Sequence, residues 1–514
     1  APALREIEAL LERGRHGEAE ILARRLVAAH PLLAPAHYTL GIVLQGSGRF
    51  ELAEPSLARA VTLDERNLDY LLNYGLCLLS MGRVAEAAPL YERARAFEPR
   101  NFVTLWRMGS FRARIGHMDE ALALYDKALH KAPEAARCQI RLEKAECLLS
   151  LGRIEDARAL MLRDLATTPH RARYLCLLSG SGRDDAGSAL YGDICAEIER
   201  PGLAPQDRCD LMIRKGVMLQ ASGRFDEAFA TLRDARKLLR TPSVTAAFGR
   251  EVDERITAFT RERIEALSAR YGRSRFRPIF VVGLPRSGTT LAAQILSAHS
   301  TAGNAGELET FTYVAARLAG GRALREIDAT LDALGSAKIE ALAQLYQQSM
   351  DYVVNGHARP VDKMPLNFRF LAEIAVLFPD ARIVHCTRHP ADTFISAFQT
   401  EMNLAHAYSY DPASYADYFR DYQRLMAHWD KVLPGRVVRL SYEDLVASPE
   451  TAIRALLASV DLPFEAACLN PERNMAPVST FSRLQVRAGI NANSVGRWKP
   501  YAAYLEPILQ LQPG

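Results

Sequence analysis

Residues 279 to 297 read Ile-Phe-Val-Val-Gly-Leu-Pro-Arg-Ser-Gly-Thr-Thr-Leu-Ala-Ala-Gln-Ile-Leu-Ser, and they give the clearest indication of the fold of the second half of the chain. The apolar, β-branched run 279–282 has the length of a buried parallel strand. Gly283 and Gly288 bracket a tight loop, and residues 291–296 begin a helix. Backbone N–H groups and the positive end of the helix dipole then converge on one place, which suits a bound anion. The stretch therefore predicts a parallel-sheet α/β domain with an anion site.

The loop has the spacing of a nucleotide-triphosphate P-loop, G-x-x-x-x-G-K-[ST], but it lacks the lysine. Thr289 stands in the lysine position, and a cation, Arg286, lies two residues before the second glycine. Without that lysine, the β- and γ-phosphates of a triphosphate lose a neutralising charge. The loop instead suits an anion with fewer charges, held by backbone, hydroxyls and a guanidinium group. An ordinary tight turn between strand and helix is the alternative interpretation.

The motif Pro-Arg-Ser-Gly-Thr-Thr-Leu at 285–291 resembles the 5′-phosphosulfate-binding loop of the PAPS-dependent sulfotransferases (PAPS, 3′-phosphoadenosine-5′-phosphosulfate). The resemblance covers residues 277–505 and is strongest to the branch containing the tyrosylprotein sulfotransferases. It implies a P-loop-like fold, PAPS as co-substrate, 3′,5′-ADP as product, and no metal. It also implies that the loop residues bind the donor. These are Pro285, Arg286, Ser287, Gly288, Thr289, Thr290 and Leu291.

Three further matches to the family imply catalytic roles. The Gly-Glu pair that ends at Glu307 matches the catalytic-base motif of this family, so Glu307 is the candidate base for the acceptor hydroxyl and Glu309 is the runner-up. Lys363 matches a family lysine that contacts the leaving group, and Ser482 matches a serine beside the transferring sulfate. Together with Arg286, these two residues are implied to stabilise charge on the sulfuryl group. A solvated, helix-capping glutamate is the alternative for Glu307.

Another group of residues is implied to bind the nucleotide part of the donor. Arg388 follows a predicted strand, 383–386, at the carboxyl end where ligands bind in open α/β sheets. Arg388 and Ser396 match the family's ligands for the 3′-phosphate. Tyr442, in a predicted strand-to-helix segment beginning at Val437, matches a tyrosine near the adenine and the 3′-phosphate.

The C-terminal segments 480–487 and 494–500 are polar and basic, and in the family such a segment folds over the nucleotide. Arg497 and Lys499 are implied to reach the 3′-phosphate, with Trp498 packed under them. Arg487 is a further candidate for a phosphate contact. The Gly-Arg-Trp-Lys sequence differs from the family's Ser-Lys-Trp type, so the register of this segment stays open.

The first half of the chain is repetitive. A Gly-Arg or Gly-His pair recurs with steps of 34, 34, 34 and 36 residues, beginning at Gly14, Gly48, Gly82, Gly116 and Gly152. This period is the signature of tetratricopeptide repeats, which stack into a superhelix. Five clear and about two degenerate repeats are predicted. The resulting domains are an all-α repeat array at 1–241, a helical connector at 242–275 and a sulfotransferase domain at 276–514.

The groove of the repeat array has three alternative uses: binding a peptide or protein, self-association, or none beyond spacing. Phe102, Trp106 and the segment from Arg112 to Arg114 are candidates to line it. The formal charge of +4 over 514 residues gives no support to nucleic-acid binding, and no run of 18 apolar residues suggests a membrane span. Eight cysteines without a CxxC pair favour a reducing, cytoplasmic setting without structural zinc.

These observations favour a sulfotransferase that acts on an acceptor hydroxyl, and two alternatives stay open. One is a small-molecule kinase, which the missing lysine argues against. The other is a repeat scaffold whose P-loop-like domain binds a nucleotide without catalysis, which would not need Glu307 or Lys363. The resemblance suggests a tyrosine of a peptide or protein as acceptor, and the sequence does not define the acceptor further.

Overall fold

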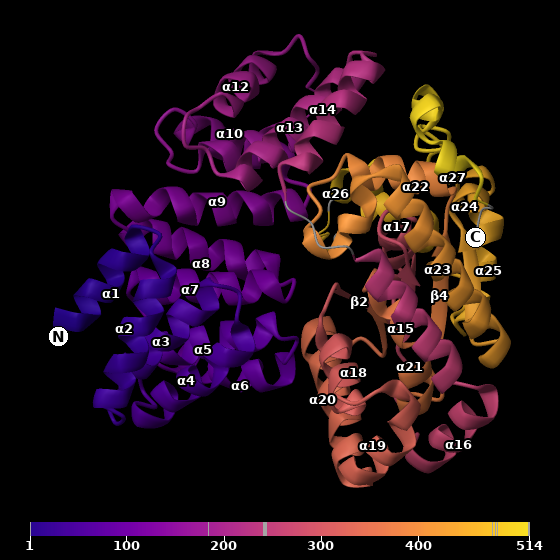
Figure 1. Ribbon diagram of the computed structural model, residues 1–514, viewed down its shortest axis with the longest axis horizontal. Coiled ribbons are helices and arrows are strands. Elements are labelled where there is room, and N and C mark those ends of the chain that lie inside the picture. The colour runs from indigo at the N-terminus through magenta and orange to yellow at the C-terminus, as the bar shows by residue number, and fades with distance from the viewer. Residues whose placement is uncertain are drawn as a thin grey trace. The chain divides into compact units, whose positions relative to one another are not determined.

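The computed structural model describes residues 2–182, 184–239, 244–474, 476–478, 480 and 482–511 (Figure 1). A helical N-terminal region precedes a domain with a five-stranded sheet and surrounding helices, so the predicted fold class is confirmed. The chain forms two compact units. Unit 1 comprises Ala1–Ile140, Leu308–Val314 and Gln344–Asn355, and unit 2 comprises Arg141–Glu307, Ala315–Ala343 and Gly356–Gly514. The domain boundary predicted at 241/242 lies outside the described residues.

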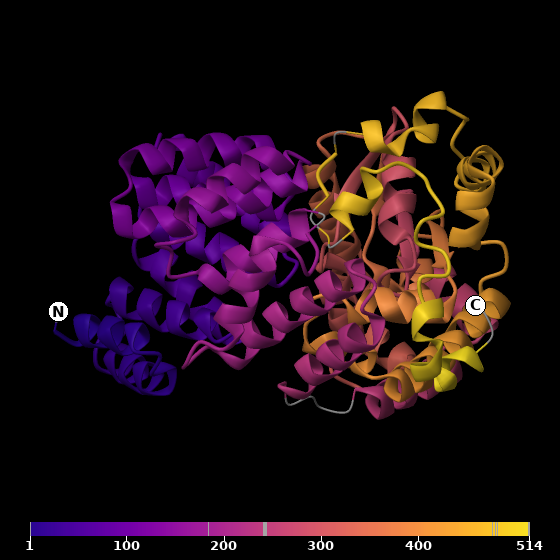
Figure 2. The same cartoon turned by 90° about the horizontal axis from the view of Figure 1, so that it is seen from above.

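The N-terminal region is built from helices joined by short turns (Figure 2). In unit 1, consecutive helices from α1 to α8 pack against each other in pairs, and α9 to α14 belong wholly or mainly to unit 2. The helices are α1 Pro2–Glu12, α2 His16–Ala29, α3 Ala34–Gly46, α4 Phe50–Leu63, α5 Leu68–Ser80, α6 Val84–Ala96, α7 Phe102–Arg114, α8 Met118–Lys131, α9 Glu134–Ser150, α10 Ile154–Asp164, α11 Arg171–Ser181, α12 Ala189–Ile198, α13 Pro205–Ala221 and α14 Phe225–Lys237.

Small residues let the paired helices approach closely. The alanine five positions after the turn glycine, such as Ala53 or Ala121, is fully buried. A glycine in the first helix of a pair also faces the second helix. A Cβ atom at Gly109 would lie 2.6 Å from the ring of Tyr125, and one at Gly216 would lie 2.7 Å from Leu232. The repeated glycine and alanine positions are therefore explained by helix packing.

The predicted connector consists of two helices in unit 2, α15 (Thr245–Ala258) and α16 (Arg261–Tyr271). Helix α15 packs against α23 (Pro412–Val432), and α16 packs against α21 (Leu371–Leu377). A buried ion pair joins Arg255 of α15 to Glu373 of α21 at 2.9 Å. Both connector helices are thus packed onto the helices that surround the sheet.

The sheet has the strand order β2-β3-β1-β4-β5, and all neighbouring strands are parallel. Its strands are β1 Ile279–Gly283, β2 Ala302–Gly306, β3 Arg359–Asp362, β4 Arg382–Thr387 and β5 Val437–Ser441. The apolar runs in the sequence predict β1, β4 and β5. The other two strands read Ala-Gly-Asn-Ala-Gly and Arg-Pro-Val-Asp, and their composition does not favour strands.

Helices cover both faces of the sheet. Val281 of β1, Ile295 of α17 and Leu456 of α25 share one apolar cluster. On the other face, His385 of β4 contacts the hydroxyl of Tyr422 from α23, and burial lowers the pKa of His385 to about 3. His385 is therefore buried and neutral, and it packs between the sheet and α23.

The remaining helices of this region are short apart from the 19-residue α20, and several of them are 3₁₀ helices. They are α17 Thr289–Ser297, α18 Thr310–Ala319, η1 Leu324–Glu326, α19 Ile327–Leu334, α20 Ser336–Val354, η2 Pro365–Phe370, α22 Pro390–Phe398, η3 Leu404–Tyr410, α24 Tyr442–Ala447, α25 Pro449–Ser459, η4 Ala466–Leu469, η5 Pro471–Arg473, α26 Arg483–Val486, η6 Lys499–Tyr504 and α27 Glu506–Leu509. Within the described ranges, no helix has both the length and the apolar character needed to cross a bilayer.

Candidate functional site

The carboxyl end of every strand carries one of the predicted site residues. Arg286 lies in the loop after β1, and Glu307, Lys363, Arg388 and Tyr442 directly follow β2, β3, β4 and β5. In an open parallel sheet, these ends form the edge where ligands bind. The topology therefore gathers residues spread over more than 150 positions of sequence at one edge of unit 2.

The loop between β1 and α17 forms a tight cradle. Gly283 has a φ of 148° and Gly288 a φ of 103°, and Arg286 also adopts a positive φ of 76°. A Cβ atom at Gly288 would lie 2.9 Å from the ring of Tyr442, so glycine is needed here for space as well as for φ. The first N–H groups of α17 have no partner inside the helix and face this loop. The hydroxyl of Ser287 is buried and has no hydrogen-bond partner in the part of the chain that the structure describes.

Each of the three guanidinium nitrogens of Arg286 donates a hydrogen bond to a neutral acceptor. Its Nε donates to Ser396 Oγ at 2.8 Å, one Nη donates to Ser482 Oγ at 2.6 Å, and the other donates to Gln485 Oε1 at 3.0 Å. Burial, followed by the neighbouring cation of Arg388, lowers the pKa of Arg286 to about 10. Among the described residues, no carboxylate forms an ion pair with Arg286. The Glu307 carboxylate acts on Arg286 only at longer range and less strongly than the three neighbouring arginines, so Arg286 keeps a surplus of positive charge.

Arg388 and Arg497 repeat this pattern. Arg388 is buried and donates to the carbonyl of Arg286 at 3.1 Å and to that of Ser494. It lies over the ring of Tyr442 at 4.7 Å, and its Nε has no partner among the described residues. Arg497 donates to Gln399 Oε1 at 3.5 Å, and burial, then Arg388, lowers its pKa. The Asp392 carboxylate acts on Arg497 at longer range, but among the described residues neither arginine forms an ion pair, and like charges held this close indicate an anion site.

A cavity of about 340 Å³ lies beside these cations. Most of the predicted donor-binding residues line it, together with parts of the C-terminal segment. The lining is Arg286, Gly288, Thr289, Thr290, Leu291, Arg388, Tyr442, Ser482, Leu484, Gln485, Val486, Ala488, Gly489, Asn491, Asn493, Ser494 and Arg497. This volume falls in the usual range of small-molecule sites, roughly 300–1,000 Å³.

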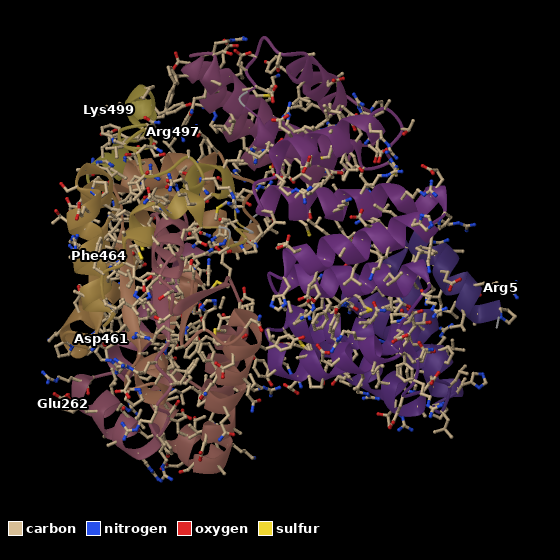
Figure 3. The ribbon with its side chains drawn as sticks, turned by 180° about the vertical axis from the view of Figure 1, so that it is seen from behind. Arg5, Glu262, Asp461, Phe464, Arg497 and Lys499 are labelled. Atoms are coloured by element: carbon tan, nitrogen blue, oxygen red, sulfur yellow. The ribbon has the colours of Figure 1, made fainter. Side chains whose placement is uncertain are left out.

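Four of the predicted donor contacts lie apart from the described lining of this cavity. Pro285 and Ser287 belong to the loop itself, and Ser396 is the partner of Arg286. Lys499 is exposed at the surface (Figure 3), whereas Arg497 is partly buried. Of the two basic residues expected to reach the nucleotide, the structure therefore brings Arg497 to the cavity.

Glu307 and Lys363 form an ion pair at the ends of the neighbouring strands β2 and β3. The Lys363 side chain is 2% exposed, whereas the Glu307 side chain is 42% exposed. The backbone N–H of Lys363 donates to the carbonyl of Gly306 at 3.1 Å, which fixes the two residues side by side. Buried Asp362 accepts from Met364 N at 3.1 Å and holds the loop that follows. The pair thus joins a buried ammonium group, on Lys363, to a solvent-accessible carboxylate, on Glu307.

The segment that carries Arg497 is fastened to α22. Asp392 accepts from the backbone N–H of Gly496 at 2.7 Å and from that of Trp498 at 3.1 Å. The Trp498 ring stacks on His389 at 5.2 Å. Arg487, a further candidate for a phosphate contact, instead donates to the carbonyls of Ser150 at 3.0 Å and Ala476 at 3.4 Å.

Several residues that shape the site have no signal in the sequence. Gln485 lies in the segment 480–487, but neither it nor Asp392 matches a family residue, and their roles follow from contacts between distant segments. Arg214, on helix α13 of the repeat region, contributes to the lowered pKa of Arg286. Within the described ranges, no group of three or more His, Cys, Asp or Glu side chains could hold a metal ion.

Comparison with protein families identifies both parts of the chain. Residues 278–466 match the sulfotransferase family, and residues 38–101 and 116–179 match tetratricopeptide repeat families. The chain therefore contains tetratricopeptide repeats and a sulfotransferase-family domain, which confirms the resemblance stated from the motifs.

Similar proteins are known from distant organisms. An uncharacterized protein of Aquifex aeolicus is 29% identical over 386 residues, which cover 72% of this chain and 49% of that protein. Protein-tyrosine sulfotransferase 1 of Danio rerio is 26% identical over 240 residues, covering 43% of this chain and 65% of that protein. The match thus spans about half of the first relative and just under two thirds of the second.

Two solved structures resemble separate parts of the chain. The sulfotransferase domain of the Synechococcus olefin synthase is 20% identical, with a TM-score of 0.35, over 47% of this chain and 98% of that one. A thermophilic tetratricopeptide repeat protein of Thermus thermophilus is 25% identical, with a TM-score of 0.32, over 34% of this chain and 97% of that one. At these scores, neither bears on the function.

Proposed function

We propose that this chain is a PAPS-dependent sulfotransferase that transfers a sulfuryl group to an acceptor hydroxyl. The observation that carries the proposal is Arg286, a cation in the loop before α17 whose hydrogen-bond partners among the described residues are all neutral. It lies in a domain that matches the sulfotransferase family and beside a cavity large enough for a small molecule. An anionic donor would supply the missing negative charge.

The residues around the cavity fit PAPS. The 5′-phosphosulfate belongs at the loop, where the Ser287 hydroxyl has no partner among the described residues and the first N–H groups of α17 have none within their own helix. The 3′-phosphate belongs near Arg388 and Arg497, since the buried Nε of Arg388 has no partner among the described residues. Ser396 reaches the donor through Arg286, and exposed Lys499 adds a weaker, screened attraction.

The pair of Glu307 and Lys363 supplies the proton chemistry. When bound, PAPS provides the sulfuryl group, which passes to the acceptor oxygen as 3′,5′-ADP is released. Glu307, the exposed member of the pair, takes the proton of the acceptor hydroxyl. Lys363 and Arg286 hold positive charge where negative charge develops, which is worth about 3 to 4 kcal/mol for one good donor. Ser482 assists by orienting Arg286.

A tyrosine of a peptide or protein is the proposed acceptor. Relatives in Danio rerio and Drosophila melanogaster are named as protein-tyrosine sulfotransferases, and tetratricopeptide repeats bind peptides in their grooves. In this proposal the array at 1–241 presents the acceptor, the helices at 242–275 connect it, and residues 276–514 bind PAPS and carry out the transfer.

The test is donor turnover by the full chain. We would incubate it with PAPS and a panel of acceptors: a tyrosine peptide, the same peptide with phenylalanine for tyrosine, a sugar and a hydroxylated lipid. The proposal predicts release of 3′,5′-ADP only with an acceptor hydroxyl, and with the tyrosine peptide but not its phenylalanine control. Binding of 3′,5′-ADP without turnover on any acceptor would instead support a nucleotide-binding scaffold.

A further inference from the structure

The turn glycines of the repeats share one backbone conformation but differ in what they touch. Each has a positive φ between 72° and 84°; they are Gly14, Gly48, Gly82, Gly116, Gly152 and Gly223. A Cβ atom added at Gly14, Gly48, Gly116 or Gly223 would meet nothing within 4 Å. A Cβ atom at Gly82 or Gly152 would collide with a segment from outside the repeats. Two turns of the array are therefore also contact points.

The Gly82 turn lies against the start of α18, within unit 1. A Cβ atom here would lie 2.6 Å from the backbone nitrogen of Thr310 and closer still to the carbonyl of Glu309. These are backbone atoms, which cannot move aside as the end of a side chain can. Residues 309 and 310 follow Glu307 by two and three positions. The turn therefore limits where the chain can run immediately after the proposed base.

Neighbouring repeat residues hold the end of α20 in the same unit. The N–H of Ala85 donates to Ser349 Oγ at 3.1 Å, and Arg112 donates to the hydroxyl of Tyr352 at 3.2 Å. The chain from α20 leads directly into β3 and Lys363. Both segments that border the Glu307–Lys363 pair in sequence are thus bound by residues of the repeats: α18 by the Gly82 turn, and α20 by Ala85 of α6 and Arg112 of α7.

The Gly152 turn holds a different segment, within unit 2. A Cβ atom at Gly152 would lie 2.5 Å from Cδ and 2.6 Å from Nε of Arg487. The carbonyl of Ser150, in the same turn, accepts from Arg487 and from the N–H of Val478, both at 3.0 Å. The chain from Val478 onward supplies the C-terminal lining of the cavity, including Ser482 and Gln485.

We propose that Gly82 and Gly152 are positioning residues for the two halves of the site. The Gly82 turn sets the geometry of the Glu307–Lys363 pair, and the Gly152 turn sets the wall of the donor cavity. The inference rests on the proposed function. It gives the repeat array a role in positioning the site residues, in addition to any role in presenting an acceptor. It does not depend on which acceptor is used.

Three alanine variants test it: G82A, G152A and the matched control G48A. Gly48 has a φ of 72°, close to the 73° of Gly82 and the 77° of Gly152, so all three variants strain the backbone alike. Of the three, G82A and G152A also place a Cβ atom within 3 Å of a neighbouring segment. Each variant is assayed for thermal unfolding, for binding of 3′,5′-ADP by calorimetry, and for kcat and KM with PAPS and the acceptor that the wild-type chain uses.

The two halves of the proposal predict different readouts. G82A lowers kcat about a hundredfold, because a displacement near 1 Å misaligns the reacting groups, and leaves the Kd for 3′,5′-ADP as in G48A. G152A raises that Kd and the KM for PAPS about tenfold, a loss of about 1.4 kcal/mol, with a smaller change in kcat. G48A differs from wild type only in its unfolding temperature.

Folded G82A and G152A that match G48A in kcat and Kd would overturn the inference. If G82A does not fold, S349A replaces it, and an unchanged kcat in S349A overturns the first half. If G152A does not fold, R487A replaces it with R487K as the conservative rescue, and an unchanged Kd in R487A overturns the second half. A wild-type chain that neither binds 3′,5′-ADP nor turns over PAPS would contradict the proposed function itself.

Discussion

The two ends of the candidate site differ in how their charges are compensated. At the donor end, Arg286 donates to Ser396, Ser482 and Gln485, all of them neutral. At the other end, buried Lys363 has a full ionic partner in Glu307. One end therefore carries surplus positive charge, and the other is balanced within the protein.

This difference in charge compensation suits the donor end to binding an anion and the Glu307–Lys363 pair to proton transfer. Partly buried cations without anions destabilise a fold, so their presence together indicates that a ligand supplies the negative charge. A self-compensated pair needs no ligand to be stable, and it offers a carboxylate for proton transfer next to a cation. Substitutions at the two ends should therefore change different quantities: binding at the donor end, and turnover at the Glu307–Lys363 pair.

The largest expected effect is on turnover when the carboxylate is removed. E307Q keeps the size of the side chain but cannot accept a proton, so kcat should fall about a thousandfold while the Kd for 3′,5′-ADP stays unchanged. Steady-state kinetics and calorimetry measure the two quantities. E309Q is the matched control, because Glu309 is exposed and two residues away. A loss of turnover in E309Q with normal activity in E307Q would reverse the assignment.

Removal of the surplus charge should act on binding instead. R286M removes a cation that would be paired only by the ligand, so the Kd for 3′,5′-ADP should rise about a hundredfold. R286K keeps the charge but not the planar fork, and it should recover part of the affinity. Equal affinity in R286M and wild type, measured by calorimetry, would remove Arg286 from the donor site.

Substitutions at the two ends should change the free energy of unfolding of the ligand-free protein in opposite directions. E307Q leaves the buried ammonium group of Lys363 without its anion, which should lower the free energy of unfolding by about 1 to 3 kcal/mol. R286M removes an uncompensated cation and should raise that free energy by about 1 kcal/mol. Thermal unfolding without ligand measures both. A shift of the same sign in the two variants would contradict the contrast.

The pH dependence of binding reports on Arg286 directly. Its pKa is lowered to about 10 in the ligand-free protein, and only the protonated form attracts the anion. Affinity for 3′,5′-ADP should therefore be constant from about pH 8 to about pH 9 and fall about tenfold by about pH 11, because binding must then restore the proton. In R286M this decline should be absent. An identical decline in R286M would assign the titration to another group.

The smallest effect separates two neighbouring cations of the C-terminal segment. R497A removes a partly buried residue that lines the cavity and should raise the Kd for 3′,5′-ADP about tenfold. K499A removes an exposed charge that is screened by salt, and its effect should stay within about twofold. Calorimetry at low and moderate salt measures both variants. Equal losses would show that Lys499 also reaches the donor.

The sequence predicts the parts of this architecture that depend on local pattern. The apolar run before Gly283 predicts β1 and its loop, and the 34-residue period predicts the repeats, which the family comparison confirms. Strands β2 and β3 escape prediction, because short segments of Ala, Gly, Asn, Arg and Pro form strands only when neighbouring strands hold them.

Contacts between distant segments could not be predicted either. Glu307 and Lys363 are both suggested by motifs, but their pairing depends on β2 lying beside β3, which a separation of 56 residues does not reveal. Likewise, the glycines at 48 and 82 have the same place in the repeat, and only the fold distinguishes the one that touches residues 309 and 310. The site roles of all these residues stay predictions until they are tested.

The most direct test is calorimetric titration of the full chain with 3′,5′-ADP and with ATP, both without magnesium and then with it. A donor site built from Arg286, Arg388 and Arg497 predicts magnesium-independent binding of 3′,5′-ADP with a Kd of about 1 μM, or about −8 kcal/mol, and weak binding of ATP. Tight, magnesium-dependent binding of ATP with no response to 3′,5′-ADP would contradict the sulfotransferase proposal and favour a kinase.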